Sequence, residues 1–189
     1  MPRMQESSAR IESVDRSDRL ILKILGSIAF AFLMILSAHI RIPLPFTPIP
    51  MTLQTFVAPL AGGFLGALWG GGSMLLYLAL GLAGLDVFAA SAGGFAIFLA
   101  PSAGYLTGFF FAAMIVGAAR NQNNLILLGA LILSQILIFA CGTLGLMANA
   151  GMSLPEAFAK GVAPFLMGDV IKITASFLVL LSYRTIIVR

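Results

Sequence analysis

Long apolar segments, separated by short polar or proline- and glycine-rich breaks, run through most of this chain. A helix needs roughly 20 apolar residues to cross the hydrocarbon core of a bilayer, and somewhat fewer when loops or interfaces assist. Six segments meet this requirement, at residues 20–40, 52–68, 70–85, 104–119, 124–148 and 164–186. The pattern predicts an all-α integral membrane protein in which six transmembrane helices form a compact bundle.

The breaks between these segments coincide with residues that interrupt a helix. Four prolines within residues 43–50 favour an extended connection, because proline lacks a backbone N–H and restricts the residue before it. We expect the glycines at 70–72 to separate the second and third segments. Residues 86–103 are rich in alanine, glycine and serine and predict a long loop, and residues 120–124 predict a polar turn.

A short additional helix is predicted between the last two segments. Ser153 and Glu156 have the spacing of a capping box, in which each side chain bonds a free amide of the first helical turn. We therefore expect a helix at residues 154–160, stopped by Gly161 and lying outside the spans.

Small residues recur every four positions in two segments, so that they share one helical face and let another helix approach closely. They are Ala58, Gly62, Gly66 and Gly70 in the second segment and Gly104 and Gly108 in the fourth. We expect helices of the same chain to pack there; docking of a partner protein is the alternative.

The composition also indicates a membrane location. Of the 189 residues, 60% are hydrophobic and only 10% are charged, and the mean hydropathy is +1.04. Soluble domains carry about 25% charged residues, so this chain has too little polar surface to cover itself in water. Residues 1–18 hold no long apolar run and are predicted to form a flexible cytoplasmic tail, which leaves residues 19–189 as the six-helix membrane domain.

Basic residues at the ends of the segments predict the orientation, since Lys and Arg concentrate in cytoplasmic loops. Placing the N-terminus in the cytoplasm also places Arg120, Arg184 and Arg189 there and leaves Arg41 and Lys160 outside. We therefore expect both termini to be cytoplasmic, in a multi-pass protein of the plasma or inner cell membrane. The net charge of +4 is spread over such flanking positions, which argues against a nucleic-acid partner.

Two charges, Asp169 and Lys172, lie inside a hydrophobic segment. A charged side chain at the centre of a span costs about 2.5–3.5 kcal/mol on insertion scales, so it commonly marks a binding site or a pathway. Because they are three residues apart, the two side chains share one face of a helix. A purely structural ion pair is the alternative to a ligand site.

Further polar residues are predicted to lie at the same outer end of the bundle. Thr52 and Gln54 begin the second segment and Tyr105 begins the fourth, while Asp169 and Lys172 lie near the start of the sixth. Thr52 also suits a helix N-cap, and Tyr105 an anchor at the membrane interface. Together these groups predict a pocket near the outer face for a small amphipathic molecule with an anionic end.

The loop from Phe88 to Phe95 is placed to close over this pocket. Phe88 would contribute to its apolar wall, while Ser91 and Gly93 would bring a hydroxyl and accessible backbone to the ligand, since glycine allows close approach.

Nothing in the sequence supports catalysis. His39 and Cys141 are the single His and Cys, they lie in different segments, and no serine and carboxylate are placed to form a nucleophile and its base. None of the three lysines follows a glycine, so a phosphate-binding P-loop is absent. We predict no enzyme activity, no cofactor and no metal; any ATP hydrolysis would belong to separate subunits.

From about residue 20 to the C-terminus, the chain resembles the BioY family, the biotin-specific S-components of energy-coupling factor (ECF) transporters. The resemblance rests on four stretches taken in order: Ile42 to Thr55, Gly84 to Phe88 with Ser91 to Gly94, Pro101 to Tyr105, and Pro164 to Lys172. It implies a six-helix fold that binds biotin from outside and works with a transmembrane coupling subunit and two ATPase subunits.

The resemblance also implies roles for the residues that match. Asp169 and Lys172 become polar ligand contacts, with Gln54, Thr52 and Tyr105 as companions. Our hypothesis is that Lys172 binds the valerate carboxylate of biotin and Asp169 accepts from the ureido N–H groups; a different division of these roles is the alternative. A facilitator that moves biotin or a small carboxylate by itself is the alternative function.

Overall fold

The computed structural model describes residues 2–89 and 93–187, with side chains from residue 17 to residue 186 apart from 90–92. Its α-helices are α1 Pro2–His39, α2 Gln54–Leu65, α3 Ala67–Leu82, α4 Ala103–Ala119, α5 Asn124–Ala150, α6 Leu154–Gly161 and α7 Leu166–Ile187. Two 3-10 helices, η1 Phe95–Leu99 and η2 Ala163–Phe165, and two short strands, β1 Arg41–Ile42 and β2 Met51–Thr52, complete the described fold. The all-α prediction is confirmed.

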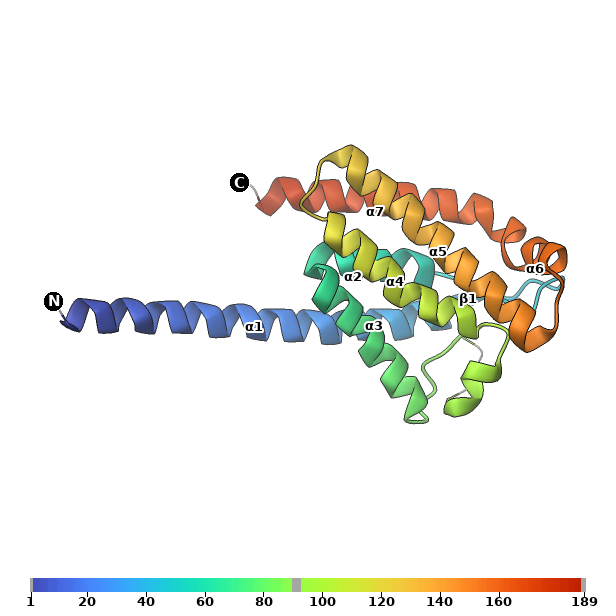
Figure 1. Cartoon of the computed structure of the whole chain (residues 1–189), viewed down its shortest axis with the longest axis horizontal. Coiled ribbons are helices and arrows are strands. Elements are labelled where there is room, and N and C mark those ends of the chain that lie inside the picture. The colour runs from blue at the N-terminus through green and yellow to red at the C-terminus, as the bar shows by residue number, and fades with distance from the viewer. Residues whose placement is uncertain (1, 90–92, 188–189) are drawn as a thin grey trace.

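The helices form one bundle, in which α1 begins and α7 ends on the same side (Figure 1). Helix α4 packs against α2, α3 and α5, while α1 packs against α2 and α3, and α7 against α2 and α5. The strands β1 and β2 pair antiparallel and close the proline-rich connection between α1 and α2. At the opposite end of the bundle from the start of α1, this connection therefore brings the start of α2 close to the starts of α4 and α7.

Three described stretches are long and apolar enough to cross a bilayer: Ser17–His39, Asn124–Ala150 and Leu154–Ile186. Helices α2, α3 and α4 are apolar but have only 12, 16 and 17 residues. At 1.5 Å per residue they reach roughly 18–26 Å, less than the roughly 30 Å of the hydrocarbon core. Large apolar side chains are exposed on the outer surfaces of α1, α5 and α7, for example Leu22, Leu133 and Val170. Lipid is the natural environment of such a surface.

The first helix begins earlier than the sequence pattern predicts. The backbone of α1 is helical from Pro2, through the residues expected to form a polar tail. Acidic residues precede basic ones by four positions at Glu6 and Arg10 and at Glu12 and Arg16, a spacing that favours a helix without any apolar stripe. The flexibility of residues 1–18 and the cytoplasmic location of both termini remain predictions.

The break between the second and third helices lies at Gly66, and not at the glycines 70–72 as the sequence suggested. Gly66 has φ of +88°, a conformation that residues with a Cβ rarely adopt, and the chain turns there into α3. The glycines 70–72 continue inside α3, where the faces of Gly70 and Gly71 are buried against neighbouring segments.

Small residues bring the helices into backbone contact, as predicted. A Cβ on Gly62 would overlap the carbonyl oxygen of Ala113 in α4, and one on Gly104 would overlap that of Cys141 in α5. Ala58 and Gly108 are also buried, the latter against Ile138. These faces are therefore occupied by helices of the same chain.

The predicted short helix is present as α6, but its capping box is not formed. Ser153 is the N-cap residue without a side-chain cap hydrogen bond. The carboxylate of Glu156 instead accepts from the ammonium of Lys160, one helical turn later, at 2.8 Å. Since this i,i+4 pair engages the Glu156 side chain, the reciprocal bond of a capping box is lost.

We expect Gly62→Ala and Gly104→Ala each to destabilise the bundle by about 1–3 kcal/mol, because the added methyl meets rigid backbone rather than a movable side chain. Thermal unfolding in detergent measures the effect. Gly72→Ala is the matched control, since nothing lies within 4 Å of a Cβ at that position of α3. Equal stability of the Gly104→Ala and Gly72→Ala variants would contradict the proposed contact.

Candidate functional site

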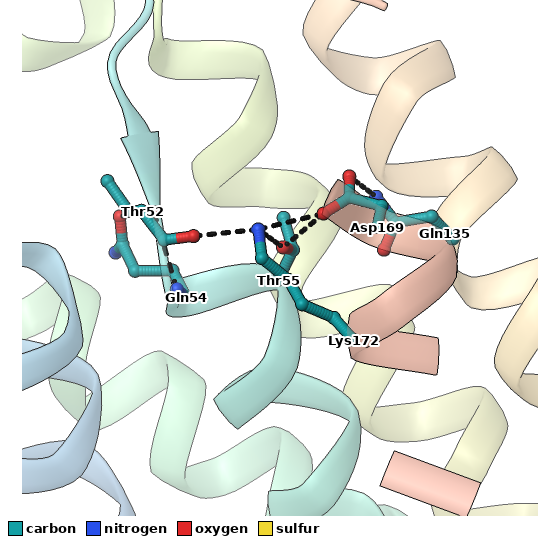
Figure 2. A network of polar contacts seen from close by, with 6 residues as sticks. All are labelled: Thr52, Gln54, Thr55, Gln135, Asp169 and Lys172. Carbon is teal, nitrogen blue, oxygen red and sulfur yellow. Dashed lines mark hydrogen bonds and ion pairs between the residues drawn. The ribbon is translucent and has the colours of Figure 1, made fainter. Parts of the chain in front are cut away.

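A buried ion pair lies at the start of α7. The ammonium Nζ of Lys172 is 2.8 Å from Oδ1 of Asp169, and their side chains are only 13% and 3% exposed. Nζ also donates to the carbonyl oxygen of Thr52 at 2.8 Å and to Oγ1 of Thr55 at 2.9 Å. The lysine thereby links α7 to the end of β2 and the first turn of α2 (Figure 2).

The Asp169 carboxylate is held from three directions. Besides Lys172, Oγ1 of Thr55 donates to Oδ1 at 3.0 Å, and Nε2 of Gln135 donates to Oδ2 at 2.7 Å. Figure 2 shows Gln135 reaching the carboxylate from α5, on the side opposite Lys172. Buried carboxylates are costly unless paired and hydrogen-bonded, and both oxygens of Asp169 are satisfied here.

A second polar chain begins at the end of β2. The hydroxyl of Thr52 accepts from the backbone N–H of Gln54 at 3.3 Å and lies 3.2 Å from its Oε1. Nε2 of Gln54 donates to the hydroxyl of Tyr77 in α3 at 2.8 Å, and this hydroxyl donates to the carbonyl oxygen of Val87 at 3.3 Å. Thr52 is not the N-cap residue of α2, which is Leu53, although its hydroxyl bonds the first amide of that helix. Its role as a ligand contact stays a prediction.

Most of these polar groups, but not Gln135 or Tyr77, line one cavity of about 60 Å³ among the described residues. Its polar lining comprises Thr52, Gln54, Thr55, Ser102, Tyr105, Asp169 and Lys172, and its aromatic walls are Phe88, Phe109, Phe139 and Phe165. The structure therefore brings together five of the predicted polar residues, with Phe88 beside them. An aromatic enclosure with one cation and one carboxylate suits a small ligand that has both polar and apolar parts.

Tyr105 and Phe88 are both buried, at 7% and 2% exposure. The hydroxyl of Tyr105 donates to the carbonyl oxygen of Gly161 at 2.6 Å, which fixes the end of α6 against α4. This side chain lies inside the protein and so does not act as an anchor at the membrane interface. The ring of Phe88 meets that of Tyr77 edge-on at 5.3 Å between centroids.

The predicted closing loop is only partly seen at the cavity. A Cβ on Gly93 would meet the carbonyl oxygens of Gly84 and Leu85, so this glycine packs against the end of α3 and does not line the cavity. Ser91 lies outside the described residues. Ala89 lines the cavity, and its carbonyl oxygen accepts a hydrogen bond from Nη1 of Arg41 on β1.

Sequence reasoning missed Gln135 and Tyr77 as members of the polar network. Gln135 is 6% exposed and Tyr77 is fully buried. A buried amide in the middle of an apolar span was the available signal for Gln135, but its spacing from Asp169 in the sequence gave no indication of contact. Within the described part of the chain, no group of three His, Cys, Asp or Glu side chains is placed to hold a metal.

We expect Lys172→Met to lower stability by about 3–5 kcal/mol, because it leaves the Asp169 carboxylate buried without a cation. The double variant Asp169→Leu/Lys172→Met should recover most of this loss, since an apolar pair needs no compensation. Thermal unfolding in detergent measures both. Lys160→Met is the control: it removes an exposed ion pair and should cost less than about 1 kcal/mol. If Lys172→Met proved no worse than Lys160→Met, the structural role of the buried pair would be refuted.

The chain matches known proteins over most of its length. Residues 7–189 match the BioY family. A biotin transporter of Rhodobacter capsulatus is 37% identical over 153 residues, which cover 73% of this chain and 80% of that protein. A probable biotin transporter of Pyrococcus horikoshii is 34% identical over 153 residues, which cover 81% of this chain and 91% of that protein.

The fold is also similar to that of a solved protein, an S-component for biotin from an ECF-type ABC transporter. The similarity has a TM-score of 0.80 with 27% identity, and it covers 89% of this chain and 93% of that chain. Because the family match spans nearly all of the sequence and the helical arrangement agrees with a solved S-component, this chain belongs to the BioY family.

Proposed function

We propose that this chain is the substrate-binding subunit of an ECF-type transporter and captures biotin for uptake across the cell membrane. Family relatives named as biotin transporters support the choice of ligand. The observation that carries the proposal is the buried pair of Asp169 and Lys172, which lines an aromatic cavity at one end of the bundle.

Biotin carries a carboxylate at one end and a cyclic urea at the other, and we assign the carboxylate to Lys172. The ammonium has three N–H donors, and the acceptors of all three are named above: Thr52, Thr55 and Asp169. Two of these acceptors are neutral. Exchange of the Thr52 carbonyl for a ligand carboxylate would replace a neutral acceptor with a charged one, which makes a shorter and stronger hydrogen bond.

We assign the urea N–H groups to Asp169. An ionised carboxylate has about four acceptor positions, and hydrogen bonds from Thr55, Gln135 and Lys172 use three of them. A further N–H donor can therefore join without displacing a partner. Gln54, Thr52 and Tyr105 are proposed as additional polar contacts, while Phe88 and the other aromatic walls pack on the apolar ring and chain.

The cavity must widen to take this ligand. Its volume of about 60 Å³ is well below the roughly 300–1,000 Å³ of small-molecule sites. A shift of Ala89 would widen the cavity, because the described polar contact of the Ala89 carbonyl is a single hydrogen bond from the exposed Arg41.

The alternative of an autonomous facilitator finds little support in the described helices. Apart from Gln135, which bonds Asp169, the buried hydroxyls of Ser73 and Ser134 bond carbonyls of their own helices. Among the described residues, these hydrogen bonds do not form a continuous chain of polar groups from the cavity to the other end of the bundle. We propose that a transmembrane coupling subunit and ATPase subunits supply the movement that releases the ligand.

Binding of biotin and of its neutral amide tests both the ligand and the assignment. By calorimetric titration in detergent, the unmodified protein should bind biotin at least about tenfold more tightly than the amide. Lys172→Met should weaken biotin binding at least about thirtyfold and abolish the difference between the two ligands. Asp169→Asn should weaken both ligands alike, because the urea is common to them.

Lys160→Met serves as the control with the same change of charge, and we expect it to bind like the unmodified protein because its side chain is exposed on α6. Absence of saturable biotin binding by the unmodified protein would contradict the proposal. If the difference in affinity between biotin and its amide were lost in Asp169→Asn rather than in Lys172→Met, the assignment of the two ends of biotin to these residues would be reversed.

The need for partner subunits is tested by uptake of labelled biotin into cells that lack their own biotin transporter. We expect accumulation when the chain is produced with coupling and ATPase subunits of an ECF transporter, and binding without accumulation when it is produced alone. Accumulation by the chain alone, at the same rate, would favour the facilitator.

A further inference from the structure

A second pocket lies at the end of the bundle opposite the ion pair. It has a volume of about 190 Å³ and is formed where α2 and α4 end, α5 begins and α7 approaches its end. The lining residues that matter here are Phe64, Arg120, Asn121, Leu180, Tyr183 and Arg184. Arg184 is 15 residues beyond Asp169 on α7, which corresponds to about 22 Å along the helix. The pocket is thus distinct from the proposed biotin site.

Two guanidinium groups line this pocket and retain free donors. Nη1 of Arg120 donates to the carbonyl oxygen of Phe64 at 3.2 Å. Arg184 donates through Nη1 to Asn124 and through Nη2 to the carbonyls of Ala119 and Arg120. Each guanidinium has five N–H donors in a planar fork that fits phosphate and carboxylate oxygens. The named bonds leave most donors of Arg120, and some of Arg184, for another acceptor.

No acidic side chain of the described residues balances these two charges. The chain has seven Asp and Glu residues. Asp86, Glu156 and Asp169 belong to the opposite end of the bundle, and the others precede residue 19 in α1. Among the residues whose side chains the structure describes, the ion pairs are Lys160 with Glu156 and Lys172 with Asp169. The pocket therefore presents a positive charge that helix C-termini compensate only in part.

Apart from Asn121, the remaining walls of the pocket are mainly apolar and aromatic. Leu180 is 2% exposed, and the rings of Phe64 and Tyr183 pack at 4.3 Å between centroids. Tyr183 and the two arginines come where the apolar parts of α4 and α7 end, the depth at which aromatic and basic residues meet lipid headgroups. A ligand that fits here has an anionic head and an apolar body.

We propose that this pocket binds the phosphate group of an anionic membrane phospholipid. Basic pockets between membrane helices recognise such headgroups. The free fork of Arg120 can supply bidentate contacts to phosphate oxygens, while Arg184 adds a second positive charge. A soluble phosphate compound would share this chemistry, but it has no apolar body to match the aromatic wall formed by Phe64 and Tyr183. The lipid bound here bridges the ends of α2, α4 and α7.

Native mass spectrometry of the full chain in detergent, titrated with phosphatidylglycerol or phosphatidylcholine, tests the proposal. We expect phosphatidylglycerol to bind about tenfold more tightly than phosphatidylcholine. Asn121→Asp should reduce this preference about fivefold, because it places a carboxylate at the pocket while keeping both arginines and their backbone bonds. Arg184→Gln should reduce it as well.

Gln122→Glu is the matched control, since it makes the same change of charge at an adjacent exposed residue that does not line the pocket. It should retain the preference for phosphatidylglycerol, and biotin binding should be unchanged in Asn121→Asp. Equal binding of the two lipids, or an equal effect of Asn121→Asp and Gln122→Glu, would overturn the site. Displacement of phosphatidylglycerol by inorganic phosphate at equal concentration would overturn the lipid as its ligand. If Arg184→Gln fails to fold, the comparison of Asn121→Asp with Gln122→Glu decides.

Discussion

The need to compensate one buried ion pair sets the arrangement of the end of the bundle at which α2, α4 and α7 begin. Two charges in an apolar interior are stabilising only when every polar atom around them is bonded. Lys172 meets this condition through the first turn of α2, and Asp169 meets it through α2 and α5. The pair therefore fixes three helices relative to one another, and any variant that removes one partner exposes the full cost of burying the other.

Under the proposed function, the same network would also act as a preorganised binding site. Asp169 and Lys172 are desolvated when the chain folds. Binding of a ligand that replaces the Thr52 carbonyl or adds to Asp169 would therefore not include the desolvation free energy of these two side chains. Hydrogen-bond exchange in an enclosed aromatic cavity also excludes water from the charged contacts, which strengthens them. Under the proposed function, the ion pair would combine a structural role with a binding role, so the two alternatives drawn from the sequence need not exclude each other.

The sequence predicted those parts of the structure that depend on local pattern. The lengths of the apolar segments predicted the membrane helices, and the two isolated charges within a span predicted the centre of the candidate site. The features that the sequence did not predict depend on which of several similar residues takes a given conformation or contact. Gly66 and Gly70 look alike in sequence, yet only the first takes a positive φ. Glu156 has two possible partners, Ser153 and Lys160, and bonds the second. Gln135 contacts a residue 34 positions away, which one sequence without relatives cannot reveal.

Helix direction accounts for the opposite chemistry of the two ends. Helices α2, α4 and α7 all begin at the cavity with Asp169 and Lys172 and run toward the pocket with Arg120 and Arg184. Their aligned peptide dipoles place positive ends at the cavity, where Asp169 lies in the first turn of α7, and negative ends at the pocket. Unpaired carbonyls at those C-terminal ends recruit the two arginines, and the arginines in turn recruit an anion. The two proposed ligands, a carboxylate at one end and a phosphate at the other, are thus consistent with the shared direction of three helices.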